Sequence, residues 1–190
     1  HWCVPRDSTA ACHSSRFSTT PSSLTTTKAR VPASISSSIT RRATGGRITL
    51  AMAEYFVTHM KVIRPNVSLM SAVSNAWPPR MLDLKAGDVL LAFDIRRYEN
   101  NVLQLVEMAA EQGAEVVVIT DPWVSPAAAH ARYRFSAQIE VPSAWDSTVA
   151  LQVLIETLMA SVQSLTWEET SARMERLEAL YARSKFFRKR

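Results

Sequence analysis

Residues 88–121, DVLLAFDIRRYENNVLQLVEMAAEQGAEVVVITD, contain the pattern that decides the fold. An apolar run from Val89 to Phe93 is followed by an amphipathic segment and then by a second apolar run from Val116 to Ile119. Short continuous apolar runs bounded by turn residues are typical of strands that are buried in a parallel sheet. The amphipathic segment between them, which ends at Gly113, predicts a crossover helix. The stretch therefore predicts a strand, a helix and a second, parallel strand.

The same alternation continues on both sides of this unit. Upstream, residues 45–63 place an apolar stripe on one face of a predicted helix, which Pro65 ends. The stripe consists of Ile48, Met52, Ala53, Phe56, Met60 and Ile63. Downstream, the pattern predicts a strand over 135–141, a long apolar helix over 143–165 and a charged amphipathic helix over 167–184. Together these elements predict an α/β fold with a parallel sheet whose crossover helices cover both faces.

The first strand of this sheet is the weak point of the pattern. A glycine turn that opens a helix, as at Gly45 and Gly46, normally follows a strand. Residues 34–43, SISSSITRRA, are a poor candidate for one. Either this segment forms the strand, or the first strand is missing or degraded.

Residues 1–44 differ from the rest of the chain. They hold 18 Ser or Thr, six Lys or Arg and one acid, Asp7, and both cysteines, Cys3 and Cys12. Without apolar periodicity such a segment cannot offset its ordering entropy, so we expect a disordered leader. A transit peptide and a non-native reading of the gene are two further interpretations, and the abrupt change at Gly45 favours the second. The expected organisation is a leader over 1–44 and a ligand-binding domain over 45–190.

The charge of the chain comes from this leader. The net charge is +5, but residues 45–190 contain 16 basic and 16 acidic residues. A neutral domain does not favour nucleic-acid binding. No apolar run approaches the ~20 residues that a membrane-spanning helix needs, so we expect no membrane partner. Residues 45–190 contain no cysteine, which fits the cytoplasmic location that we expect.

The carboxyl ends of parallel strands share one edge of the sheet, where such folds bind ligands. Free N–H groups at a helix start attract an anion, and the guanidinium fork of arginine matches phosphate or carboxylate. Four segments are expected at this edge. Their candidate ligand-binding residues are Gly45, Gly46, Arg47 and Thr49; Asp94, Arg96, Arg97, Tyr98 and Asn101; Asp121 and Ser125; and Ser143, Asp146 and Ser147.

Several of these residues have simpler interpretations. Arg97 could form a surface ion pair with Glu99, and Asp146 or Ser143 could cap the long helix. Because neighbouring side chains of an extended segment point to opposite sides, we expect one of the two arginines to face the ligand and the other to pair with an acid such as Glu99. No histidine has a partner at metal-ligand spacing and no catalytic constellation is evident, so we expect neither metal nor cofactor nor catalytic residues.

The order and spacing of short motifs resemble the sugar isomerase (SIS) domain from about residue 45 to 182. The motifs are Gly87-Asp88-Val89, Ala110 to Ala114, Thr120-Asp121, Ser125-Pro126 and the helix start expected at 143–147. The chain is most similar to the effector-binding half of the RpiR/MurR transcriptional regulators. The resemblance implies a three-layer α/β/α sandwich with a mainly five-stranded parallel sheet in flavodoxin-like order, a homodimer and a phosphosugar ligand. One departure is evident: the phosphate loop of the family is rich in Ser, Thr and Gly, whereas residues 94–98 read DIRRY.

The resemblance implies a domain that senses a phosphosugar or other acidic metabolite and dimerises within a transcriptional regulator. DNA binding would require a helix-turn-helix domain, for which residues 1–44 lack the periodicity. The first alternative is a sugar-phosphate isomerase, which needs a base such as Glu156 or Glu99. The second is an incomplete fragment without function. We expect a sensor rather than an enzyme.

Overall fold

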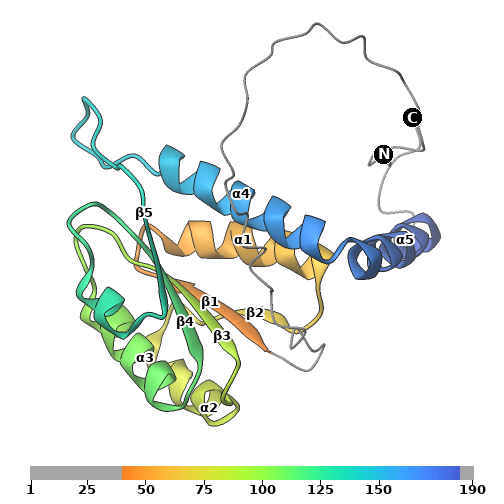
Figure 1. Ribbon diagram of the computed structural model, residues 1–190, viewed down its shortest axis with the longest axis horizontal. Coiled ribbons are helices and arrows are strands. Elements are labelled where there is room, and N and C mark those ends of the chain that lie inside the picture. The colour runs from red at the N-terminus through yellow and green to blue at the C-terminus, as the bar shows by residue number, and fades with distance from the viewer. Residues whose placement is uncertain (1–39, 185–190) are drawn as a thin grey trace, which may run out of the picture. The chain divides into compact units, whose positions relative to one another are not determined.

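The computed structural model describes residues 40–184, which form a three-layer α/β/α domain (Figure 1). Residues 1–39 of the leader expected over 1–44 lie outside the described residues. The elements, in chain order, are β1 (Arg41–Gly45), α1 (Leu50–Ile63), β2 (Val67–Leu69), the 3-10 helix η1 (Ser74–Ala76), α2 (Trp77–Leu82), β3 (Val89–Phe93), α3 (Asn100–Glu111), β4 (Glu115–Thr120), the 3-10 helix η2 (Pro126–His130), β5 (Tyr133–Ser136), α4 (Val149–Leu165) and α5 (Trp167–Ser184).

The five strands form one parallel sheet in the order β2-β1-β3-β4-β5, which is the flavodoxin-like order. Val89 of β3 lies opposite Glu115 of β4, and the pairing runs in register to Phe93 and Ile119. The predicted β-α-β unit is therefore confirmed, with α3 as its crossover helix. Figure 1 shows α1 and α4 on one face of the sheet and α2 and α3 on the other.

The first strand is present. β1 is an inner strand of the sheet and pairs with both β2 and β3. It crosses the domain boundary expected between residues 44 and 45, so the folded domain begins before Gly45. The buried side chain of Arg42 pairs with Asp88 at 3.6 Å, and the N–H of Thr40 donates to the Asp88 Oδ1 at 2.8 Å. Hydrogen bonding and an ion pair therefore hold a strand that has little apolar character of its own.

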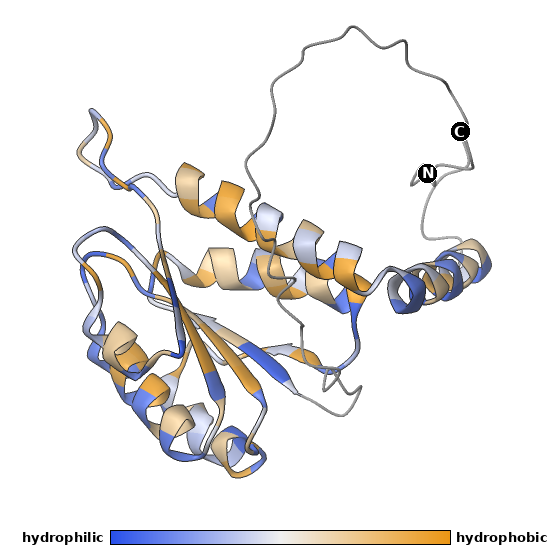
Figure 2. Cartoon of the chain, viewed as in Figure 1, coloured by the Kyte–Doolittle hydropathy of each residue, from blue (hydrophilic) through white to orange (hydrophobic). Residues whose placement is uncertain are grey.

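Two apolar clusters fill the space between the layers. The first joins α1 and α4 to the sheet and includes Phe56, Phe93 and Ile155. The second joins α2 and α3 to the opposite face and includes Trp77 and Leu105. Figure 2 shows apolar residues along the middle of β3 and β4, whereas β1 begins with a hydrophilic segment. The two strands with the clearest sequence signal thus have both faces in the core.

Some element boundaries differ from the sequence predictions. Helix α1 begins at Leu50, so Ile48, expected on its buried stripe, lies in the preceding turn and is 45% exposed. The last strand spans 133–136 rather than 135–141, and α4 begins at Val149 rather than at 143. Within the described residues, no single helix is long and apolar enough to span a membrane; α4 and α5 meet the length and composition criteria only as a pair bent by 100°.

Candidate functional site

The carboxyl ends of β1 and β3 meet the segment before α4 around an open cavity of about 810 Å³. Its lining comes from residues 46–49, 94–99 and 144–146. A smaller hollow of about 400 Å³, lined by Arg96 and residues 140–146, adjoins it. Three of the four segments predicted for this edge therefore line the larger cavity. The fourth, around Asp121, lies behind it.

The turn after β1 requires its glycines for different reasons. A Cβ atom on Gly45 would lie 2.7 Å from the backbone carbonyl of Thr49, too close for any other residue. A Cβ atom on Gly46 would meet the side chain of Glu99, 2.8 Å from its Oε1. Thr49 donates its hydroxyl to the Phe93 carbonyl at 2.8 Å and is almost fully buried, so it joins the turn to β3.

Asp94, directly after β3, is a buried carboxyl and is only 2% exposed. It accepts a short hydrogen bond from the Ser125 hydroxyl and a longer one, 3.3 Å, from the Glu99 N–H. Burial raises its pKa to about 6, although the hydrogen bond from Ser125 acts in the opposite direction. Ser125 also caps η2 by accepting from the Ala127 N–H at 3.1 Å, as the sequence predicts. The hydrogen bonds of Asp94 to Ser125 and Glu99 thus stabilise the turn that follows β3.

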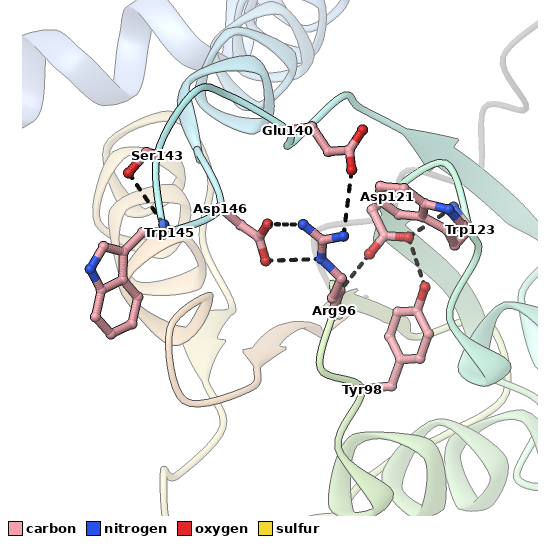
Figure 3. Close-up of polar contacts among 8 residues, drawn as sticks. All are labelled: Arg96, Tyr98, Asp121, Trp123, Glu140, Ser143, Trp145 and Asp146. Carbon is pink, nitrogen blue, oxygen red and sulfur yellow. Dashed lines mark hydrogen bonds and ion pairs between the residues drawn. The ribbon is translucent and has the colours of Figure 1, made fainter.

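Asp121, at the end of β4, is fully buried and accepts four hydrogen bonds (Figure 3). The donors are the Arg96 N–H at 2.7 Å, the Tyr98 hydroxyl at 2.8 Å, the Trp123 N–H at 3.0 Å and the Val124 N–H at 3.2 Å. Burial and then the hydrogen bond to Asp121 raise the pKa of Tyr98 to about 12. Asp121 therefore holds the turn after β3 in place through Arg96 and Tyr98, and its carboxylate oxygens are already hydrogen-bonded within the protein.

Arg96 is held by acids of the segment before α4. Its guanidinium donates to both carboxylate oxygens of Asp146, lies 3.6 Å from Glu140 and stacks 4.7 Å from the centre of the Trp123 ring (Figure 3). The bond from Arg96 lowers the pKa of Asp146. One arginine does pair with an acid, as expected, but the acid is Asp146 rather than Glu99. Asp146 is correspondingly not the cap of α4.

Arg97 differs from its neighbour. It lines the larger cavity, is exposed, and makes no ion pair or hydrogen bond with any residue between 40 and 184. The expected surface pair with Glu99 does not form, because the Glu99 carboxylate accepts instead from the Arg47 N–H at 2.5 Å. Arg97 is therefore a cation that this edge of the sheet leaves without an ion pair, although its charge helps to lower the pKa of Asp146; the exposed side chain of Arg47 is a second cation in the same cavity wall.

The remaining predicted residues lie at the margin. Asn101 is exposed in the first turn of α3 and does not line the cavity. Ser143 accepts from the Trp145 N–H at 3.2 Å and lines only the smaller hollow; Ser147 accepts from the Val149 N–H at 3.3 Å. Neither Ser143 nor Asp146 caps α4. Among the described residues, no group of three or more His, Cys, Asp or Glu could hold a metal ion.

The predicted site residues do not include five residues of the cavity wall: Ile48, Ile95, Glu99, Ala144 and Trp145. Of these, Glu99 has a charged side chain and Trp145 an aromatic one. Glu99 was considered as an ion-pair partner for Arg97 and as a base, not as a ligand of the turn after β1. Trp145, which lines both hollows and is 71% exposed, was not considered. The available signal was its position: the indole directly precedes Asp146, a predicted binding residue.

Comparison with known proteins gives one family. Residues 35–161 match the SIS domain. No curated protein sequence matches the chain.

Solved structures share its architecture. The sugar isomerase domain of an RpiR transcription factor from Sphaerobacter thermophilus superposes with a TM-score of 0.69 at 19% identity, covering 73% of this chain and 78% of that one. Vibrio vulnificus NanR, complexed with ManNAc-6P, gives 0.62 at 15% identity, covering 76% and 56%. The c3406 protein of E. coli CFT073, in complex with A5P, gives 0.59 at 12% identity, covering 75% and 78%. At these identities the likeness establishes the fold.

Proposed function

Because the chain belongs to the SIS domain family, we propose that it is the ligand-sensing and dimerisation domain of a transcriptional regulator. The ligand is a phosphosugar or another acidic metabolite that binds in the cavity at the carboxyl ends of β1 and β3. Two similar structures are an RpiR transcription factor and NanR, and two contain the ligands ManNAc-6P and A5P. DNA binding would belong to a separate helix-turn-helix domain.

The observation that carries the proposal is Arg97. A cation with no ion pair among the described residues lines a cavity of about 810 Å³, within the size range of small-molecule sites. The turn that leads into α1 also lines the cavity; its Gly46 N–H donates to the Phe93 carbonyl and its Arg47 N–H to Glu99, and the start of a helix favours negative charge. A ligand with an anionic group at one end and hydroxyls at the other matches this distribution.

The placement of the acids supports a sensor over an isomerase. Aldose–ketose isomerisation needs a base beside the substrate. Glu156 does not line the cavity; it accepts hydrogen bonds from the Tyr55 hydroxyl and the Gln152 amide on the surface between α1 and α4, both at 3.1 Å. Glu99 lines the cavity but is bonded to Arg47. This arrangement is better suited to binding than to proton transfer.

Calorimetric titration of sugar phosphates and their unphosphorylated parents tests the proposal. We expect binding of a phosphorylated sugar, and we expect Arg97→Ala to weaken it by roughly ten- to a hundredfold, as for the loss of a charge-assisted contact. Arg183→Ala, an exposed arginine in the last turn of α5, is the matched control and should bind normally.

Two results would contradict the proposal. If a sugar phosphate binds equally well to the wild type and to folded Arg97→Ala, the anion site is elsewhere. If NMR of the bound mixture records conversion of an aldose phosphate to its ketose, the isomerase alternative is correct.

A further inference from the structure

The Glu99 side chain joins two helix starts. Its backbone is the N-cap of α3, but its carboxylate makes no cap hydrogen bond there. The carboxylate reaches instead to the turn before α1, where it accepts from the Arg47 N–H at 2.5 Å, across a sequence separation of 52 residues. The cap residue of one helix thus supplies an anion to another.

The start of helix α1 has no acidic residue of its own to interact with its N–H groups. Its N-cap residue Thr49 makes no side-chain cap hydrogen bond because its hydroxyl donates to Phe93. The partial positive charge at a helix start is stabilised by a nearby anion. Glu99 supplies it from outside the helix.

The turn is also shaped to admit a group from outside. Any Cβ atom on Gly46 would lie 2.8 Å from the Glu99 Oε1, so the absence of a side chain at Gly46 makes room for the carboxylate. The same carboxylate belongs to the wall of the 810 Å³ cavity, beside Arg97. An anion can therefore reach this position from the cavity as well as from α3.

We propose that the Glu99 carboxylate is an internal anion that occupies the position of the ligand's phosphate, and that the ligand must displace it. This inference rests on the proposed function. Displacement leaves the Arg47 N–H bonded to phosphate and places Arg97 against the same group. If Glu99 remained, two anions would share one donor, and their repulsion in a partly buried site would oppose binding.

This arrangement selects for the doubly charged phosphate ester over a carboxylate. A singly charged carboxylate ligand exchanges one carboxylate for another at the Arg47 N–H and gains little. A phosphate near neutral pH carries close to two charges and three acceptor oxygens, so it outcompetes Glu99. The structure thus favours sugar phosphates over acidic sugars as the ligand class.

Asp146 also binds a cation, the Arg96 guanidinium, but a ligand would displace it less readily than Glu99. Arg96 is held by both Asp146 oxygens, by Glu140 and by the Trp123 ring, whereas Glu99 is held by one backbone donor. The carboxylate with fewer contacts is the one that moves.

The test titrates inorganic phosphate into wild type, Glu99→Gln and Glu99→Ala, following the amide resonances of Gly46 and Arg47 by NMR. Glu111→Gln, an exposed acid at the other end of α3, is the matched control. Before any phosphate is added, the Arg47 amide should shift in both Glu99 variants, because it loses a charged acceptor. With phosphate, we expect both variants to saturate at about tenfold or more lower concentration than wild type and control.

The outcomes separate the two proposals. Weaker phosphate binding by Glu99→Gln would overturn the inference and make Glu99 a ligand-binding group. Equal binding by all proteins would also overturn it. If sugar phosphates bind and Arg97→Ala weakens them while the Glu99 variants gain nothing, only the inference fails. If no sugar phosphate binds any protein, but inorganic phosphate binds more tightly once Glu99 is replaced, only the proposed function fails.

Discussion

Arg96, at the end of β3, is bonded through its guanidinium to both carboxylate oxygens of Asp146, fifty residues further along the chain. This contact joins the turn after β3 to the irregular segment between β5 and α4. Both side chains are partly exposed, and Glu140 extends the same pairing. The pair therefore links two walls of the cavity at the surface and is not part of the core.

We expect Asp146→Asn to loosen this segment without unfolding the domain. Exposed ion pairs contribute little to stability, so the urea midpoint of unfolding should stay close to that of the wild type. Hydrogen exchange over residues 137–148 should become faster, because Arg96 no longer restrains the segment. Asp83→Asn, an exposed acid after α2, serves as the control. Unchanged exchange over 137–148 would show that the pair restrains nothing.

Asp94 should make stability depend on pH. Its folded pKa of about 6 lies above its ordinary value of 3.8, so the folded state binds more protons between these values and stability falls as pH rises from about 4 to about 6. The loss from this group should be about 2–3 kcal/mol. Asp94→Asn, which cannot ionise, should lack this part of the pH dependence.

The measurement is urea denaturation of both proteins at pH 4, 5, 6 and 7.5. Other groups titrate equally in both, so the difference between the two unfolding free energies isolates Asp94. A difference that stays constant across these pH values would contradict the assigned pKa.

Substitutions at the adjacent glycines should have unequal effects. Gly45→Ala would force its Cβ against the Thr49 backbone, which cannot move without shifting the start of α1, so we expect a loss of about 1–3 kcal/mol. Gly46→Ala meets only the end of the flexible Glu99 side chain and should cost less. Thermal unfolding of the two variants gives the comparison. Equal melting temperatures would mean that the turn adapts more readily than its geometry indicates.

The exposed face of α4 carries our proposal of dimerisation. Val149 and Val153 are 70% and 61% exposed one turn apart, whereas Leu151 and Met159 of the same helix are buried in the core. Val153→Glu should shift the protein from dimer to monomer in light scattering at tens of micromolar. Val73→Glu, at an equally exposed valine before η1, should leave the dimer intact. A wild-type protein that is monomeric at this concentration would refute the proposal.

The parts of the fold that could be predicted are those whose apolar residues face the core on both sides. β3 and β4 are of this kind, and so is the buried stripe of α3. β1 could not be recognised because its sequence, RRATG, lacks the apolar residues that usually mark a buried strand. Arg42 is buried because it forms an ion pair with Asp88. β5 was displaced because it is an exposed edge strand, whereas Ile139 beyond it is fully buried.

The sequence predicts which strand ends lie together at the cavity, but it does not predict the contacts between their side chains. The strand ends correctly placed Arg97 beside the turn after β1. Which acid pairs with Arg96 could not be deduced, because Asp146 becomes its neighbour only through the path of residues 137–148, which have no regular structure. Glu99 was likewise assigned to a partner two residues away, although its actual donor, Arg47, lies across the fold.

The position of β1 has a consequence for how the chain assembles during synthesis. β1 is the strand that joins β2 to the rest of the sheet, and its partner positions in β3 begin 48 residues later, with Val89 opposite Arg41. A ribosome-bound chain therefore cannot complete the pairing of β1 with β3 until Phe93 has emerged. Until then β1 has one edge without a partner, and long-range parallel pairing of this kind is slow and exposed to aggregation. The two arginines and the threonine of this strand disfavour such aggregation. A polar inner strand therefore protects the incomplete chain, which is an advantage that cannot be seen in the folded protein.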